Sequence, residues 1–139
     1  MAGYSGTPLV TKLGIKAGHR LGLLNAPDAF STLLVDLPGD VDVRTRARGP
    51  LDVIVSFHVW RRDFERRMPA LVKALDLNGG LWVAWPKKTV PKHVAKVPTD
   101  MTEDVVREVA LPIGLVDNKV CAIDETWSGL RVVWRRERR

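Results

Sequence analysis

The stretch LDVIVSF, residues Leu51–Phe57, decides the fold class because it is rich in β-branched side chains and almost continuously apolar. This composition is typical of a parallel strand that is covered on both faces of its sheet. Two shorter apolar runs, Arg20–Leu24 and Leu81–Trp85, are also bounded by turn residues. We therefore predict a buried sheet with Leu51–Phe57 near its centre.

Apolar residues at helical spacing predict three helices around these strands. The first follows Asn25 and carries its apolar face on Phe30–Leu34. The second spans Phe64–Leu75 and is expected to be kinked or divided by Pro69. The third occupies Thr102–Gly114, with a threonine N-cap and a closing glycine.

Further strands are predicted on both sides of the second and third helices. Val41–Thr45 alternates like a half-buried edge strand, whereas Lys119–Ile123 and Leu130–Trp134 flank a turn and should pair antiparallel. Strands that alternate with helices indicate a mainly parallel sheet. We predict a single Rossmann-like three-layer α/β domain with about six strands and a C-terminal antiparallel hairpin, a size that 139 residues allow.

The formal net charge of +6 is concentrated at the C-terminus. Arg131–Arg139 contain five arginines and one glutamate, so most of the excess belongs to the last nine residues. The candidates for contact with nucleic acid are Arg135, Arg136, Arg138 and Arg139, in the basic tail 135–139. The alternative is a solvated chain end that aids solubility.

Composition excludes several classes of protein. No apolar run approaches the length needed to cross a bilayer, and residues 1–18 form a lead-in segment without the pattern of a signal peptide. The single cysteine, Cys121, excludes an intrachain disulfide and a cysteine-rich metal site. We expect a cytoplasmic protein in which this thiol is inert inside a strand, with a redox-responsive role as the alternative.

Ligands of such sheets bind beyond the carboxyl ends of the parallel strands. The residues after the first strand are Asn25-Ala26-Pro27-Asp28, where a dinucleotide or S-adenosylmethionine site needs glycines and free N–H groups. Proline removes one such donor, and the chain contains neither Gly-x-Gly-x-x-Gly nor a Walker A sequence. We expect no cofactor, and Asn25 remains a candidate for contact with another ligand.

A lysine- and proline-rich loop, residues 86–99, follows the strand that ends at Trp85. It contains four lysines and no acidic residue, so Lys87 and Lys88 could hold a phosphate or carboxylate. Trp85 could flank the same crevice and stack on a ligand, or pack in the core. The alternative for the loop is a solvated connection.

The turn Asp124–Gly129 is the most polar segment near a strand end. Asp124 and Glu125 could act as an acid–base pair or bind a cation, with Trp127 beside them, or could simply be solvated. The three histidines are far apart in the sequence and have no carboxylate at metal-ligand spacing. We therefore expect no metal site.

Four segments, Gly3–Leu9, Leu13–Lys16, Leu81–Lys88 and Val120–Leu130, resemble the actinobacterial domain-of-unknown-function family 3052. The resemblance extends over nearly the whole chain and implies an actinobacterial, cytoplasmic origin. It implies no particular reaction.

A weaker resemblance is to class I methyltransferases. Arg20–Asn25 resembles their first strand, Leu51–Phe57 their fourth, and Leu75–Trp85 the approach to their fifth. Thr102–Trp134 resembles their closing helix and hairpin. The sequence departs from them in lacking the glycine-rich loop and one strand–helix unit between Thr45 and Leu51.

Three hypotheses about function follow. The first is a non-catalytic binding or regulatory module for a small anionic ligand or a protein partner. The second is an enzyme, degenerate and methyltransferase-like, that uses Asp124 and Glu125 beside the lysine loop. The third is a regulator that contacts nucleic acid through its arginine tail.

Overall fold

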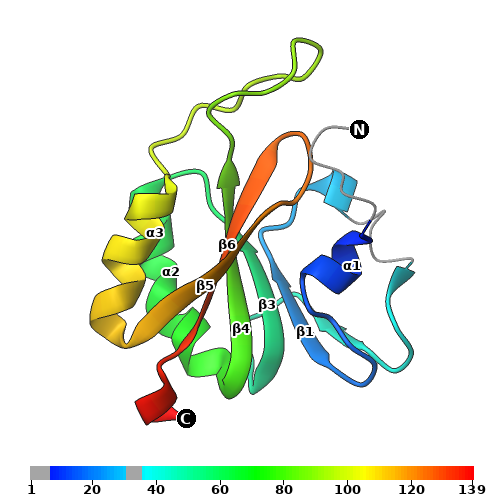
Figure 1. Cartoon of the computed structure of the whole chain (residues 1–139), viewed down its shortest axis with the longest axis vertical. Coiled ribbons are helices and arrows are strands. Elements are labelled where there is room, and N and C mark those ends of the chain that lie inside the picture. Colours follow the sequence, from blue (N-terminus) through cyan, green and yellow to red (C-terminus); the bar gives the residue numbers. More distant parts are fainter. Residues whose placement is uncertain (1–6, 31–35) are drawn as a thin grey trace.

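The computed structural model describes residues 7–30 and 36–139 (Figure 1). A six-stranded sheet of order β2-β1-β3-β4-β6-β5 forms the centre of a single α/β domain. The first four strands in that order are mutually parallel, and β6 is antiparallel to both of its neighbours. The strands are β1 (Arg20–Leu24), β2 (Asp42–Arg44), β3 (Leu51–Phe57), β4 (Leu75–Pro86), β5 (Leu115–Ala122) and β6 (Trp127–Trp134). The predicted fold class, with its C-terminal antiparallel pair, is confirmed.

The helices are distributed unequally over the two faces of the sheet. The long helix α2 (Arg61–Ala74) and α3 (Glu103–Ala110) pack on one face, and the one-turn helix α1 (Leu9–Lys12) packs on the other. Short 3₁₀ turns, η2 (Leu111–Ile113) and η3 (Arg136–Arg138), follow α3 and end the chain. None of the helices in the described residues is long and apolar enough to span a membrane.

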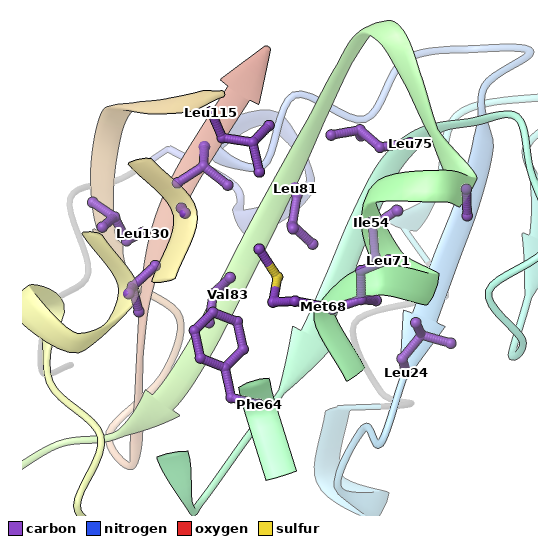
Figure 2. Close-up of a cluster of buried hydrophobic side chains, with 14 of the residues drawn as sticks. Leu24, Ile54, Phe64, Met68, Leu71, Leu75, Leu81, Val83, Leu115 and Leu130 are labelled. Atoms are coloured by element: carbon purple, nitrogen blue, oxygen red, sulfur yellow. The ribbon is translucent and has the colours of Figure 1, made fainter. Parts of the chain in front are cut away.

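Alternate side chains of β3 and β4 enter two separate cores. Ile54, Leu81 and Val83 face α2 and α3, where Phe64 and Met68 meet them (Figure 2). The residues between them face α1, and the Trp82 indole N–H donates to the carbonyl oxygen of Leu13 at 2.9 Å. Burial on both faces is what the composition of Leu51–Phe57 predicted.

Helix α2 and β4 differ from the sequence prediction. Pro69 neither divides nor ends α2, which continues from Arg61 to Ala74 with this exposed proline inside it. The helix ends at Ala74, and Leu75 takes an extended conformation and pairs with Leu51. The expected stop at 78–80 therefore lies within β4, where Gly79 comes too close to the β3 backbone to carry a side chain.

In the C-terminal hairpin, the second strand along the chain, β6, lies nearer the centre of the sheet than the first, β5. The segment predicted as Lys119–Ile123 is the longer strand β5 at the edge of the sheet, whereas β6 lies between β5 and β4. A register shift between Asp117 and Lys119 interrupts the β5–β6 pairing. Residues 28–30 form a 3₁₀ turn, and most of the helix predicted over Phe30–Leu34 falls on residues outside those described.

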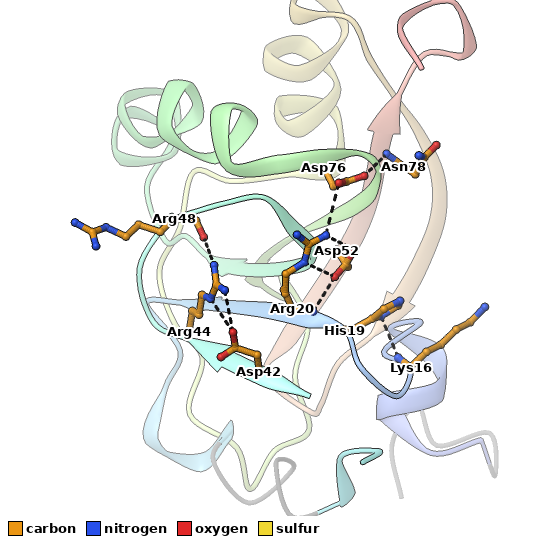
Figure 3. A network of polar contacts seen from close by, with 9 residues as sticks. All are labelled: Lys16, His19, Arg20, Asp42, Arg44, Arg48, Asp52, Asp76 and Asn78. Atoms are coloured by element: carbon orange, nitrogen blue, oxygen red, sulfur yellow. Dashed lines mark hydrogen bonds and ion pairs between the residues drawn. The ribbon is translucent and has the colours of Figure 1, made fainter. Parts of the chain in front are cut away.

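The connection from β2 to β3 crosses β1 without a helix. Parallel strands usually need a crossover of about a dozen residues, but residues 45–50 suffice here because β2 has only three residues. Arg44 braces the crossover by donating to the carboxylate of Asp42 and to the carbonyl oxygen of Arg48 (Figure 3). As predicted, β2 is an edge strand.

Truncating Ile54 to alanine should lower the free energy of unfolding by about 2–4 kcal/mol, because it leaves a cavity beneath α2. Chemical denaturation monitored by circular dichroism measures this loss. Val120→Ala is the matched control, since Val120 is 54% exposed on β5 and its truncation should cost less than about 0.5 kcal/mol. Equal losses in the two variants would contradict the central position of β3.

Candidate functional site

The carboxyl ends of β1 and β2 form a shallow groove of about 580 Å³. Asn25 closes β1 in the left-handed conformation, with φ of 58°, which asparagine tolerates better than most residues. Its side-chain amide donates to the carbonyl oxygen of Phe57 at 3.4 Å. Ala26–Asp28 continue the wall of the groove, which Val43 of β2 and the following residue Thr45 also line. Asn25 therefore lies at a groove, and its contact with a ligand stays a prediction.

Three aromatic rings fill the centre of the carboxyl edge. The Phe57 ring meets the edges of Phe30 and Trp127, at centroid distances of 5.0 and 5.1 Å. Phe30 and Phe57 are buried, and Trp127 is half-buried. The candidate Trp127 thus packs on the end of β3, and these rings take the space beside the ends of β3 and β4.

A buried polar pair, Ser56 and His58, lies at the end of β3 on the α2 side. The Ser56 hydroxyl and His58 Nε2 are 2.6 Å apart, and both residues are at most 3% exposed. Burial lowers the pKa of His58 to about 4, with the Arg67 charge acting in the same direction and Asp63 opposing it. A neutral imidazole closed off from solvent suits a structural role. Sequence reasoning missed the pair, although a Ser-x-His at the end of an apolar strand was a usable signal.

The structure separates Trp85 from the lysine loop that follows it. Trp85 is only 8% exposed and belongs to the core beneath α2 and α3. Lys87 and Lys88 instead line an open groove of about 550 Å³ together with Lys96 and residues 97–99. The loop projects from the sheet as a long excursion between β4 and α3 (Figure 1). Trp85 thus contributes to packing, whereas Lys88 and Lys96 are exposed and Lys87 is half-buried.

Asp124 and Glu125 have different partners at the β5–β6 turn. One oxygen of the Asp124 carboxylate accepts the backbone N–H groups of Thr126 and Trp127, at 2.8 and 2.7 Å. Glu125 lies 3.2 Å from His93 Nε2 and so links the turn to the lysine loop. Neither carboxylate lines the grooves that the described residues form near α1, beside Asn25 and at the lysine loop. The arrangement stabilises a turn, and a role of the two carboxylates as an acid–base pair stays a prediction.

The remaining candidates lie away from the carboxyl edge or on the surface. Cys121 is half-buried on β5, and burial raises the pKa of its thiol against the opposing charges of Lys12 and Lys119. In the exposed basic tail, the Arg138 guanidinium lies 5.9 Å from the ring centre of Trp134. The other tail candidates, Arg135, Arg136 and Arg139, are exposed. Among residues 7–30 and 36–139, no group of histidine, cysteine or acidic side chains is placed to hold a metal ion.

Comparison with solved structures places this architecture among methyltransferase folds. A SAM-dependent methyltransferase from Aquifex aeolicus is 9% identical with a TM-score of 0.59, over 89% of this chain and 86% of that one. A putative type 11 methyltransferase from Sulfolobus solfataricus is 10% identical with a TM-score of 0.61, over 91% and 89%. The DhpI–SAH complex is 12% identical with a TM-score of 0.61, over 93% and 83%. At these identities the likeness concerns the fold alone.

The sequence matches no family model and no curated protein. The resemblance to domain-of-unknown-function family 3052 therefore stays a prediction. The resemblance to class I methyltransferases is supported at the level of the fold.

The Ser56–His58 pair predicts a loss of stability in mild acid. The unfolded chain takes up a proton on His58 near pH 6.5, whereas the folded protein does so only near pH 4. The unfolding free energy should therefore fall by about 3 kcal/mol as the pH drops through this window. Urea denaturation at a series of pH values measures the decline.

His58→Gln provides the comparison, because it removes the titrating imidazole. Its unfolding free energy should change less than that of the wild type between pH 6.5 and 4. Asp52, whose pKa is lowered mainly by its hydrogen bond with Arg20, affects the pH dependence of stability below this pH range. Parallel pH profiles for the two proteins would show that His58 is not held neutral.

Proposed function

We propose that this chain is a methyltransferase-like binding module that does not catalyse methyl transfer and that engages an anionic partner through its lysine loop. The observation that carries the first half of the proposal is the aromatic packing at the end of β3, where the Phe57 ring contacts Phe30 and Trp127. The groove beside Asn25 stays open at the ends of β1 and β2, but the rings take up the adjoining part of the edge where Rossmann-like sheets bind their ligands.

The turn after β1 also disagrees with such a cofactor. Cofactor turns in this fold offer glycine backbone and a row of N–H donors. Here Asn25 adopts the left-handed conformation at the turn, and its side-chain amide donates to the carbonyl oxygen of Phe57. Pro27 has no backbone N–H. The last residue of β2 is Arg44, which occupies a place where a ribose-binding acid would be expected. The residues present do not fit the cofactor of the neighbouring structures.

The lysine loop supports the second half of the proposal. Lys87, Lys88 and Lys96 line one open groove without an acidic residue, and no ion pair involves them in the described residues. Lys87 N–H donates to the Thr126 carbonyl oxygen, and Thr99 Oγ1 donates to the Val59 carbonyl oxygen, so both ends of the loop are anchored. A projecting cationic loop with anchored ends suits an acidic segment of a protein partner.

S-Adenosylmethionine and S-adenosylhomocysteine should leave the melting temperature unchanged within about 1 °C, since neither binds the folded chain. Differential scanning fluorimetry with each compound, beside an active SAM-dependent methyltransferase as positive control, tests this expectation. A concentration-dependent rise of several degrees would show that the carboxyl edge opens to the cofactor and would refute a non-catalytic role.

Replacing Lys87 and Lys88 together with glutamine should weaken the binding of a labelled oligoglutamate peptide by about fivefold, because two exposed charge contacts are lost. Fluorescence anisotropy at low salt measures the affinity. The double variant Arg62→Gln with Lys73→Gln changes the net charge equally at exposed positions on α2 and should bind almost as well as the wild type. Equal weakening in both variants would show that overall charge, and not the loop, attracts the peptide.

A further inference from the structure

A second polar groove, of about 500 Å³, opens on the α1 face of the sheet. Its walls come from the turn after α1, from the first residues of β3 and from the middle of β5 and β6. It lies toward the amino-terminal ends of the parallel strands, opposite the edge where this fold places its ligands. The basic and amide residues that line it include Lys12, Asn78, Asn118, Lys119 and Arg131.

Two like charges face each other at the floor of this groove. Lys119 on β5 and Arg131 on β6 are direct cross-strand partners, so their side chains project from the same face. Like charges in this position destabilise a sheet. Lys119 Nζ donates to the carbonyl oxygen of Lys12 at 3.1 Å. Because this acceptor is neutral, the bond does not offset the repulsion between the two positive charges. The pair is costly unless an anion joins it.

The acidic residue that lines the groove is already neutralised. Asp52 accepts the backbone N–H of Arg20 at 2.7 Å and two guanidinium bonds, each 3.0 Å long (Figure 3). Asp76 lies 3.7 Å from the same guanidinium. The Asp52 carboxylate is therefore paired with Arg20 and does not neutralise Arg131 or Lys119.

The position of the Arg131 side chain depends on a glycine beneath it. Its guanidinium lies over Gly80 of β4 so closely that a Cβ at that position would come within 2.4 Å of Arg131 Nε. In the described residues the Arg131 side chain has no ion pair and no hydrogen-bond partner, although burial, with Arg139 nearby, lowers its pKa. Arginine nevertheless keeps its charge in proteins, and its planar fork matches the oxygens of a phosphate.

We propose that this groove binds a small phosphorylated molecule, with Arg131 and Lys119 on the phosphate and the amides of Asn78 and Asn118 within the same groove for the remainder of the ligand. The volume exceeds that of phosphate alone and falls within the usual range for small-molecule sites. This site goes beyond the proposed function, because it shares neither residues nor edge with the lysine loop.

The test is a titration of the isotopically labelled full chain with inorganic phosphate and with ribose 5-phosphate, followed by NMR. Saturable shifts are expected at the amides around Lys119 and Arg131, and ribose 5-phosphate should bind more tightly than phosphate. Arg131→Gln should weaken the binding by about tenfold or more, since a charge-assisted fork is lost.

Gly80→Ala is the sharper variant, because it keeps every charge and only displaces the guanidinium, the flexible end of a long side chain. It should weaken binding nearly as much as Arg131→Gln and keeps the proposal testable if that variant fails to fold. Arg135→Gln, with the same loss of charge on the exposed tail, should bind within about twofold of the wild type.

Three outcomes would overturn the proposal. The first is the absence of saturable shifts with either compound up to about 20 mM, weaker than any useful site. The second is unchanged affinity in both Arg131→Gln and Gly80→Ala. The third is a short oligonucleotide that saturates the same amides more tightly than ribose 5-phosphate, which would make the groove a nucleic-acid contact.

Discussion

The parallel pairing of β3 with β4 supports every other element of this fold, because both strands are buried on both faces. A parallel sheet in this position must be covered twice. Helices α2 and α3 cover one face, whereas the described residues place on the other face the single turn of α1 and the 3₁₀ turn that contains Phe30. Aromatic side chains and arginine stems complete that second face, and the unusual features of the molecule gather there.

This unequal covering links the two ends of the sheet. Toward the carboxyl edge, the Phe57 ring packs against Phe30 and Trp127 at the end of β3. Toward the amino edge, the guanidinium of Arg131 lies over Gly80. Aromatic packing at one end of this face and a cationic groove at the other thus flank the same pair of central strands.

Local patterns predicted the elements that depend on local chemistry. Leu51–Phe57, the helix capped by Thr102 and the antiparallel final strands all follow from composition and periodicity, and the structure contains them. Features that depend on neighbours in space were harder to predict from the sequence. The edge position of β5 follows from the insertion of β6, and the burial of Trp85 follows from the face that α3 covers. The opposition of Lys119 and Arg131 required the register, which no single segment of the sequence reveals.

The placement of β5 also affects how copies of the chain meet one another. An outer strand of eight residues offers unpaired backbone groups along its free side, and such edges invite intermolecular sheet formation. The irregular register between Asp117 and Lys119 interrupts the regularity that a second chain would need. Lys119 adds a charge at the same point. Lys119, one of the two residues that make the groove cationic, thus also protects the outer strand against aggregation.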